Sequence, residues 1–429
     1  MKVFKKVFGI ISSLSLMMLS PFSAQGQPVS EEWVKQYASG GVAIDITIDS
    51  IDNVYVTGEG ATIKYDTNGN ELWVKGGRTS SIAVDLRDNV YVTGLSATTK
   101  YDTNGNELWV KYLTGALWGK WLDNIGYDCR SYYMYRLALD SMGNVYVTGF
   151  CRFTYNEDMG VTIKYDTNGN ELWAREAQRQ YSYDITADSS GNVYVSGRNY
   201  WGGTYVLTKY DTNGNVLWVK QWDNGATTAD SMGNIYIIIN STIAKYDIDE
   251  NKLWAAQYYG GTPTGIIIDS AGKIYVTGTS NGNRTTVKYD ADGNELWNKQ
   301  YNVTTSDYPD YQYVTGITLD SRGNIYVTGV SNNDYVTVKY DTDNGNKLWE
   351  IRYDGGGYDQ PMALVVDSAS NVYVTGYSYN YDYTEIKYLT IKYSQAPSTP
   401  AEVVNAVDTM LASGEISSAA IANTIIAQL

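Results

Sequence analysis

The feature that most constrains the fold of this chain is a spacing: eight times, an aspartate lies six residues before the tyrosine of a recurring strand-like motif. Each tyrosine lies in a strand-like run, such as the NVYVTG sequence from Asn53 to Gly58. Successive tyrosines are 36 to 55 residues apart, and a repeat of this length predicts a propeller or a solenoid. The pairs are Asp49/Tyr55, Asp85/Tyr91, Asp140/Tyr146, Asp188/Tyr194, Asp230/Tyr236, Asp269/Tyr275, Asp320/Tyr326 and Asp367/Tyr373.

Each copy of the repeat predicts four antiparallel strands. In the second copy an apolar run at 82–84 ends at Asp85, and β-prone runs follow at 89–93, 98–101 and 107–112. The last two runs are joined by a turn that contains Asn-Gly, which is a strong hairpin signal because tight hairpins need residues that accept positive φ. Valine, isoleucine, tyrosine, threonine and tryptophan dominate the runs, as expected for packed strands. The fold class predicted is therefore all-β.

The tryptophans predict how the array closes. Fourth strands that carry a tryptophan follow only seven of the eight copies, and the last copy ends at 391–393 without one. The segment 32–37 reads like the missing strand, and its pairing with the last copy would hide both open sheet edges. We therefore predict an eight-bladed β-propeller of four-stranded antiparallel blades closed by an N-terminal strand, with seven blades as the alternative. The seven tryptophans are Trp73, Trp109, Trp173, Trp218, Trp254, Trp297 and Trp349.

The repeat resembles the secreted bacterial β-propeller repeat family, known as SBBP. Units of that family look like Asp-x-x-Gly-Asn-Val-Tyr-Val-Thr-Gly followed by Lys-Tyr-Asp-x-Asn-Gly-Asn-x-Leu-Trp, and both halves recur in register over residues 31–393. The fifth copy departs from the pattern, since it reads Ile-Tyr-Ile-Ile-Ile at 235–239, without Thr-Gly. The resemblance implies a propeller, usually of seven blades, and export. It implies little about activity.

Three segments lie outside the predicted propeller at 31–393. Residues 1–26 combine lysines, an apolar run at 7–19 and small residues near the end, which predicts a signal peptide. No second apolar run follows that could span a membrane, so we expect an exported protein in an extracellular, cell-surface or periplasmic location. Residues 394–400 are predicted to be a linker, and 401–429 a short helical hairpin.

Composition excludes several classes of function. Residues 1–26 contain three lysines and no acidic residue, so their removal changes the formal net charge from -15 to -18. Such an acidic protein is a poor partner for nucleic acid or an anionic membrane. The chain has no histidine, which excludes Ser-His-Asp and Cys-His catalysis and histidine-ligated metals. In an exported protein Cys129 and Cys151 are expected to form a disulfide, with two free thiols as the alternative.

Loop lengths indicate which face of the propeller binds a ligand. The turns after the first and third strands hardly vary, whereas the connections between repeats and between second and third strands vary widely. An up-and-down blade places both variable connections on one face, where a rigid scaffold would present them. The longest insertion and the next variable loop supply aromatic and acidic residues suited to stacking on sugars or anchoring a protein. The candidate ligand-binding residues are Trp118, Trp121, Tyr127, Tyr132, Tyr133, Glu157 and Asp158. The alternative is a hydrophobic lid over the channel.

Other constellations carry weaker signals. The stretch 66–71 looks like the start of a calcium loop but lacks the later glutamate, so hairpin chemistry explains it and we predict no metal site. Asp354 and Asp359, around the glycines at 355–357, would suit glycoside hydrolysis if their carboxylates converged. The spacing of Asp341, Gly345 and Trp349 resembles the tryptophan-docking motif of quinoproteins, but no adjacent cysteine pair is present.

The sequence therefore favours an exported, non-catalytic propeller that needs no cofactor and binds a glycan or a protein ligand on its variable face. The alternative is an extracellular enzyme, either one that uses carboxylates on glycosides or a quinoprotein.

Overall fold

The computed structural model describes most of the predicted propeller. Its described residues are 29–37, 41–95, 97–112, 131–152, 158–178, 180–199, 203–222, 226–230, 232–239, 241–249, 251–280, 283–301, 314–380, 382 and 384–395. The predicted signal peptide at 1–26, most of the predicted linker and the predicted helical hairpin at 401–429 lie outside these residues.

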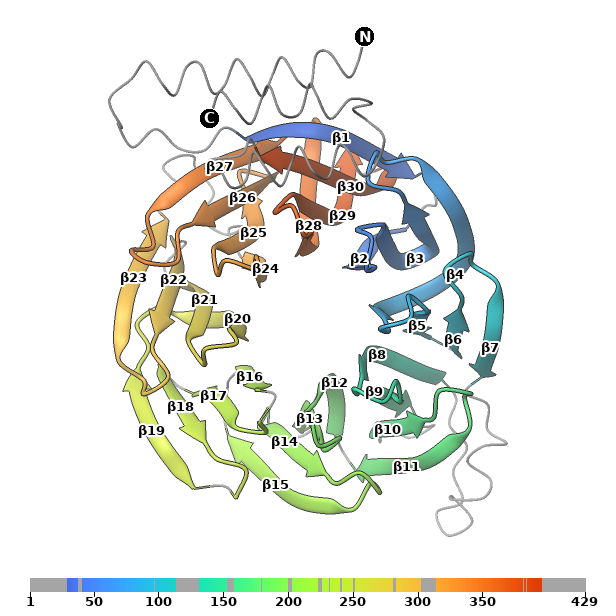
Figure 1. Ribbon diagram of the computed structural model, residues 1–429, viewed down its shortest axis with the longest axis vertical. Coiled ribbons are helices and arrows are strands. Elements are labelled where there is room, and N and C mark those ends of the chain that lie inside the picture. Colours follow the sequence, from blue (N-terminus) through green and yellow to red (C-terminus); the bar gives the residue numbers. More distant parts are fainter. Residues whose placement is uncertain are drawn as a thin grey trace, which may run out of the picture.

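Strands make up the regular structure of the described chain, and no helix occurs within it. In Figure 1 they form a ring, with the first strand of each repeat near the centre and the strand that carries the tryptophan at the rim. The strands are β1 (Val29–Tyr37), β2 (Ala43–Ile48), β3 (Val54–Tyr65), β4 (Glu71–Val84), β5 (Val90–Gly94), β6 (Ala97–Tyr101), β7 (Glu107–Tyr112), β8 (Ser131–Leu139), β9 (Val145–Arg152), β10 (Met159–Tyr165), β11 (Glu171–Gln178), β12 (Gln180–Ala187), β13 (Val193–Asn199), β14 (Tyr205–Tyr210), β15 (Val216–Trp222), β16 (Ala226–Ala229), β17 (Ile235–Ile239), β18 (Thr242–Tyr246), β19 (Lys252–Gln257), β20 (Thr262–Ile268), β21 (Ile274–Ser280), β22 (Asn283–Tyr289), β23 (Glu295–Tyr301), β24 (Val314–Leu319), β25 (Ile325–Ser331), β26 (Asp334–Tyr340), β27 (Lys347–Tyr353), β28 (Gly357–Val366), β29 (Val372–Asn380) and β30 (Ile386–Gln395).

The number of sheets corrects the predicted blade count. Within the described residues the strands form seven sheets, six of four strands and one of six, in place of the eight separate blades predicted. The cause is β4, which pairs with β3 up to Arg78 and with β5 from Thr79 onward. This unbroken strand is both the outer strand of the first repeat and the inner strand of the second. Two of the eight sequence repeats therefore share one sheet.

The predicted closure of the ring by an N-terminal strand is confirmed. β1 pairs antiparallel with β30, the third strand of the last repeat, and Trp33 lies opposite Lys392 while Tyr37 lies opposite Tyr388. The sheet has the order β1-β30-β29-β28, so its outer and inner strands come from opposite ends of the described chain. The free edge of β30 is thereby covered, as the argument from unpaired edges predicts.

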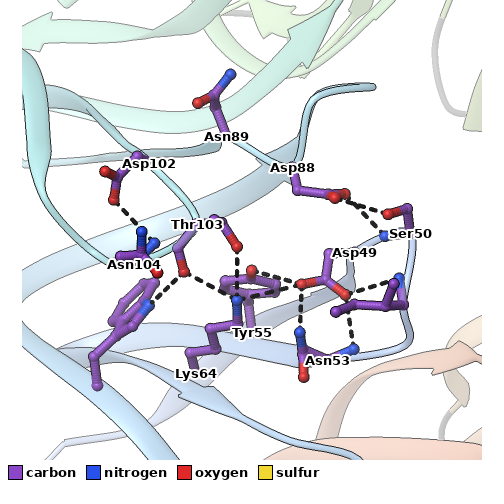
Figure 2. Close-up of polar contacts among 12 residues, drawn as sticks. Asp49, Ser50, Asn53, Tyr55, Lys64, Asp88, Asn89, Asp102, Thr103 and Asn104 are labelled. Atoms are coloured by element: carbon purple, nitrogen blue, oxygen red, sulfur yellow. Dashed lines mark hydrogen bonds and ion pairs between the residues drawn. The ribbon is translucent and has the colours of Figure 1, made fainter. Parts of the chain in front are cut away.

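A buried polar network explains the spacing of aspartate and tyrosine (Figure 2). In the first repeat the Tyr55 hydroxyl and the Asn53 side-chain amide both donate to Asp49 Oδ2, each over 2.8 Å. Lys64 Nζ lies 3.4 Å from the same oxygen, and both charged side chains are almost fully buried. Buried charges are tolerated only when they are paired and hydrogen-bonded, so the six-residue spacing places each donor on its acceptor. The tyrosine hydroxyl donates to the aspartate in all eight repeats.

The same network joins each repeat to the next. Lys64 Nζ donates to the Thr103 carbonyl oxygen over 3.0 Å, and Trp73 Nε1 donates to that oxygen over 3.2 Å. Thr103 lies in the turn between the third and fourth strands of the second repeat, as Figure 2 shows beside Asp102 and Asn104. Tryptophan and lysine at equivalent positions reach the matching turns at Thr67, Thr167, Thr212 and Thr342.

Candidate binding face

The antiparallel order of the strands separates the two faces of the ring. Both short turns of each repeat lie on one face, and their aspartates hydrogen-bond back onto the turn, as Asp66 does with the backbone and side-chain amides of Asn70. This closed geometry satisfies the aspartate within the hairpin and confirms that the stretch 66–71 is a turn. The opposite face carries the variable connections, which is where the candidate residues were predicted.

Three charged side chains on inner strands of the first four repeats influence one another. Asp45 is on β2, Arg136 on β8 and Asp184 on β12, and each lies four residues before the aspartate of its repeat. Asp45 Oδ2 accepts a hydrogen bond of 3.1 Å from the Ile82 backbone amide in the next repeat. Arg136 donates from an Nη atom to the Ser80 carbonyl oxygen over 3.0 Å. These contacts join the inner strands of the first and third repeats to β4.

The two carboxylates of this group have raised pKa values, unlike Asp49 and Asp85 of the repeat network, whose pKa values are lowered. Burial raises the pKa of Asp45, and the positive charge of Arg136 and the Ile82 amide offset only part of this effect. Burial likewise raises the pKa of Asp184, again opposed by Arg136, although the Asp184 side chain is exposed to solvent. Protein atoms therefore surround Asp184 closely enough to raise its pKa, while water still reaches its side chain. Carboxylates in such a setting exchange protons and hydrogen bonds with a ligand more readily than ordinary surface acids.

A cluster of five aromatic rings is built from β8, β9 and β12. Phe150 stacks on Tyr133 with ring centroids 4.9 Å apart and meets Tyr181 edge-on at 4.8 Å. Tyr135 lies 5.5 Å from Phe150 and 5.7 Å from Tyr183, and Tyr183 stacks on Tyr181 at 6.0 Å. Tyr183 is 40% exposed. Tyr183, which precedes Asp184 in β12, therefore gives the cluster an aromatic surface that solvent reaches.

Two of the predicted candidates belong to this aromatic cluster or support it. The guanidinium carbon of Arg152 lies over the ring of Tyr133, 5.4 Å from the ring centroid. Asp158 is only 4% exposed, and its Oδ2 accepts a 2.7 Å hydrogen bond from the Tyr181 hydroxyl. Arg152 Nε lies 3.6 Å from the other oxygen of Asp158. Asp158 thus positions Tyr181 and Arg152.

The remaining candidates cannot be placed in the same way. Trp118, Trp121, Tyr127 and Glu157 lie outside the described residues, and of Tyr132 the structure describes only the backbone, opposite Cys151 in the pairing of β8 with β9. Cys129 also lies outside the described residues, so its disulfide with Cys151 stays a prediction.

Sequence reasoning missed Asp45, Arg136 and Asp184, although a signal was present. Four residues before the repeat aspartate, the first four copies have Asp45, Ser81, Arg136 and Asp184, whereas the last four have only alanine or glycine, at 226, 265, 316 and 363. A comparison of repeats at that one position would have shown that one half of the ring carries charge. The closeness of the three charged residues depends on the ring and could not be read from spacing.

The junction between the fourth and fifth repeats is less complete than the others. Trp218 Nε1, which corresponds to the donor of Trp73, has no hydrogen-bond partner among the described residues. A pocket of about 30 Å³ opens there, between Asp184, Tyr194 and Ser196 on one side and Thr228 and Ile235 on the other. Its volume suits a water molecule or a small polar group that reaches Asp184.

The structure also places the residues of the quinoprotein-like motif and the pair of Asp354 and Asp359. Trp349, from the motif that resembles quinoproteins, has a structural role at a repeat junction, where its Nε1 donates to the side chain of Gln395 in the last repeat. Asp354 and Asp359 do come together, but with Asp334 as a third carboxylate. The described residues include no helix able to cross a membrane.

Comparisons with known proteins agree with this architecture. No curated protein matches the chain. The chain is similar to the Dos1 propeller, with a TM-score of 0.57 and 11% identity, over 87% of this chain and 97% of that one. It is also similar to the Pan2 WD40 domain of Neurospora crassa, with a TM-score of 0.49 and 9% identity over 88% and 98% of the two chains. Streptogramin B lyase gives a TM-score of 0.45 and 13% identity over 85% and 100%.

At these identities the similarity to Dos1 shows the fold alone, and the two lower scores add nothing to it. Residues 256–284 and 299–335 match the SBBP family, described as a beta-propeller repeat. These segments run from the end of the fifth repeat to the third strand of the seventh, and the same pattern recurs around the ring. The chain is therefore a β-propeller, and two of its segments match the SBBP-type beta-propeller repeat.

Proposed function

We propose that this chain is an exported, non-catalytic binding module that holds a glycan, or else a protein ligand, on the face with the variable connections. Two observations carry the proposal: the Tyr183 ring is exposed, and Asp184, the next residue in β12, interacts electrostatically with Arg136. An exposed aromatic ring can stack on the apolar face of a sugar, while a carboxylate and a guanidinium bind its hydroxyl groups. The aromatic cluster and Asp158 hold the tyrosines in place before any ligand arrives, which lowers the entropy cost of binding.

A glycan array probed with the full chain tests this proposal, followed by calorimetry with the strongest glycan. We expect Tyr183→Ala and Asp184→Asn each to weaken binding about tenfold or more, which corresponds to about 1.4 kcal/mol. Tyr259→Ala is the matched control, because Tyr259 is also exposed and lies in a connection between repeats. Equal affinity for all three variants would place the binding site elsewhere.

The enzyme alternative is tested with the same variants. The raised pKa values of Asp45 and Asp184 would also suit an acid–base pair acting on glycosides. A hydrolysis screen with the array sugars separates the two functions. Turnover that Asp184→Asn abolishes would overturn the non-catalytic reading, whereas binding without turnover supports it.

Export and the disulfide are tested together on protein secreted by a bacterial host. An intact mass that lacks the first 24 or 26 residues and is two mass units below the fully reduced value would agree with signal removal and with a Cys129–Cys151 bridge. Full-length protein retained in the cytoplasm would contradict export, and two thiols open to alkylation would contradict the bridge.

A further inference from the structure

Three aspartates meet where the seventh repeat joins the eighth. Asp334 begins β26, Asp354 lies in the connection from β27 to β28, and Asp359 lies within β28. One carboxylate oxygen of each lies within 4.8 Å of the others. Two oxygens bound to the same Ca²⁺ at about 2.4 Å can be at most about 4.8 Å apart, so one ion can bridge all three.

Asp359 supplies a second observation, because it is fully buried and one of its oxygens is unused. Its Oδ2 accepts a 2.6 Å hydrogen bond from the Gly355 backbone amide, whereas Oδ1 has no hydrogen-bond partner among the described residues. A buried carboxylate oxygen without a donor is costly, and elsewhere in this protein every repeat aspartate is bonded to its tyrosine hydroxyl. The Gly355 amide and the Ser378 hydroxyl serve the Asp359 carboxylate, yet Oδ1 stays without a partner among the described residues, beside two carboxylates that cannot donate when ionised.

The local backbone allows close approach to this group. A β-carbon at Gly355 would lie 2.7 Å from Asp359 Oδ1 and 2.8 Å from Ser378 Oγ, so only glycine fits. The loop therefore closes directly over Asp359. Asp354, at the start of the same loop, is held by its own turn, in which Oδ1 accepts a 2.8 Å hydrogen bond from the Gly356 amide.

Nearby positive charge is directed elsewhere. Arg352 is the cation that acts on Asp334, but its Nε donates to Glu350 and an Nη atom donates to Ser331, each over 3.2 Å. Burial and the charges of Asp354 and Asp359 raise the pKa of Asp334 to about 6, with Arg352 opposing them. Three carboxylates thus repel one another without an ion pair of their own among the described residues.

We propose that Asp334, Asp354 and Asp359 bind one divalent cation with oxygen preference, Ca²⁺ being the best fit. The ligand set is made of hard oxygen donors and contains neither sulfur nor imidazole, which disfavours zinc and copper. Ca²⁺ accepts irregular sets of carboxylate, backbone and water oxygens, whereas Mg²⁺ demands near-ideal octahedral geometry and retains its water. The ion would link β26 to the loop before β28 and so fasten the seventh repeat to the sheet that closes the ring.

Calorimetry with CaCl2 on the full chain, after treatment with a chelator, tests the site. We expect one binding event, weakened about tenfold or more in Asp334→Asn and Asp354→Asn, because affinity depends on the number of charged ligands. Asp292→Asn is the control, since Asp292 is an exposed carboxylate in a turn between third and fourth strands. MgCl2 is titrated in parallel and should bind more weakly.

Melting curves provide the second measurement. Ca²⁺ should raise the melting temperature of the wild type and of Asp292→Asn but not that of Asp354→Asn, because a ligand that binds only the folded state stabilises it. Asp354 is exposed, so its substitution removes a ligand without disturbing the core, and this variant decides the question even if Asp359→Asn fails to fold. Ca²⁺ effects of equal size in all variants, or no Ca²⁺ effect in the wild type, would overturn the proposal.

Discussion

The regular junction between two repeats and the junction just before ring closure both supply an oxygen that accepts hydrogen bonds from a lysine and a tryptophan. The two junctions use different groups for this purpose. Between the first and second repeats, Lys64 and Trp73 donate to one backbone carbonyl, that of Thr103. Between the seventh and eighth repeats the equivalent donors, Lys339 Nζ and Trp349 Nε1, both reach Gln395 Oε1, over 2.7 and 3.0 Å.

The difference follows from the way the ring closes. In a regular repeat a hairpin turn joins the third and fourth strands and supplies the carbonyl. In the last repeat β1 takes the place of the fourth strand, so β30 ends without that turn and the amide of Gln395 replaces it. Gln395 Nε2 also donates to the Tyr326 hydroxyl over 3.2 Å and to the Ser370 carbonyl. A backbone acceptor is fixed by its hairpin, whereas this one depends on a single side chain that must lose rotamer freedom.

Removal of the closing strand should have the largest effect. Deletion of Glu31–Tyr37 exposes the edge of β30 and removes Trp33, which packs between Tyr65 and Tyr373 with centroids 6.0 and 5.8 Å away. We expect a loss of cooperative unfolding in the last sheet and aggregation, because an unpaired edge recruits other strands. Thermal melts with light scattering measure both effects. A soluble deletion variant with an unchanged melting temperature would show that β1 is not needed for closure.

A regular junction should be the next most sensitive place. Lys64→Met leaves Asp49 buried without its cation and removes the donor to Thr103, and we expect a loss of about 3 to 5 kcal/mol. Denaturant unfolding gives the change in free energy. The control is Lys347→Met, since the pair between Lys347 and Glu350 is half exposed and should contribute less than about 1 kcal/mol. Equal losses in both variants would refute a special role for the buried lysine.

The closing junction should be weakened by the loss of one side chain. Gln395→Ala leaves Lys339 and the Trp349 indole without their acceptor, and we expect a cost of about 1 to 3 kcal/mol in the same unfolding experiment. Gln395→Glu retains an acceptor for both donors and should lose less than the alanine variant. If Gln395→Ala unfolds like the wild type, water replaces the amide and the comparison between the two junctions loses its basis.

The smallest expected effect is a dependence on pH that marks the closing junction. Burial lowers the pKa of Lys339 to about 8, and Asp320 opposes this effect only in part. A lysine whose pKa is lower in the folded state loses its proton at a lower pH in the folded protein than in the unfolded chain. The destabilisation caused by burying its charge therefore falls as the pH rises above about 8 toward the unfolded pKa of about 10.4.

We therefore expect stability to rise by roughly 1 kcal/mol between pH 7.5 and pH 9. Denaturation midpoints at the two pH values measure the change, and Lys339→Met should reduce it. A rise of the same size in Lys339→Met would assign the effect to other buried lysines, such as Lys100, Lys164 and Lys288, whose pKa values burial also lowers.

Much of the fold could be predicted because its signals are local. The pairing of Asp49 with Tyr55, the hairpin turns and the closing strand all follow from spacing within one repeat or from a count of tryptophans. The number of sheets could not be predicted, because it depends on whether β4 bends or continues between two repeats. Gln395 was also missed, since the sequence around it reads as a linker, and its role arises only where the regular turn is absent.

The candidate sites show the same division. The sequence selected Tyr133 and the pair of Asp354 and Asp359 from their composition and loop position, but it did not bring in Asp184 or Asp334. Those residues belong to different repeats or different strands from their partners, and only the curvature of the ring makes them neighbours.

The sequence by itself determined that this protein is a ring of antiparallel repeats, because strand alternation, tight turns and the Asp–Tyr spacing act over a few residues. Only the tertiary structure decided which charges face one another across repeats: Asp45, Arg136 and Asp184 on the inner strands, and Asp334 with Asp354 and Asp359 beside the closing sheet. The physical reason is that electrostatic interactions depend on distance in space, which the order of residues along the chain does not specify.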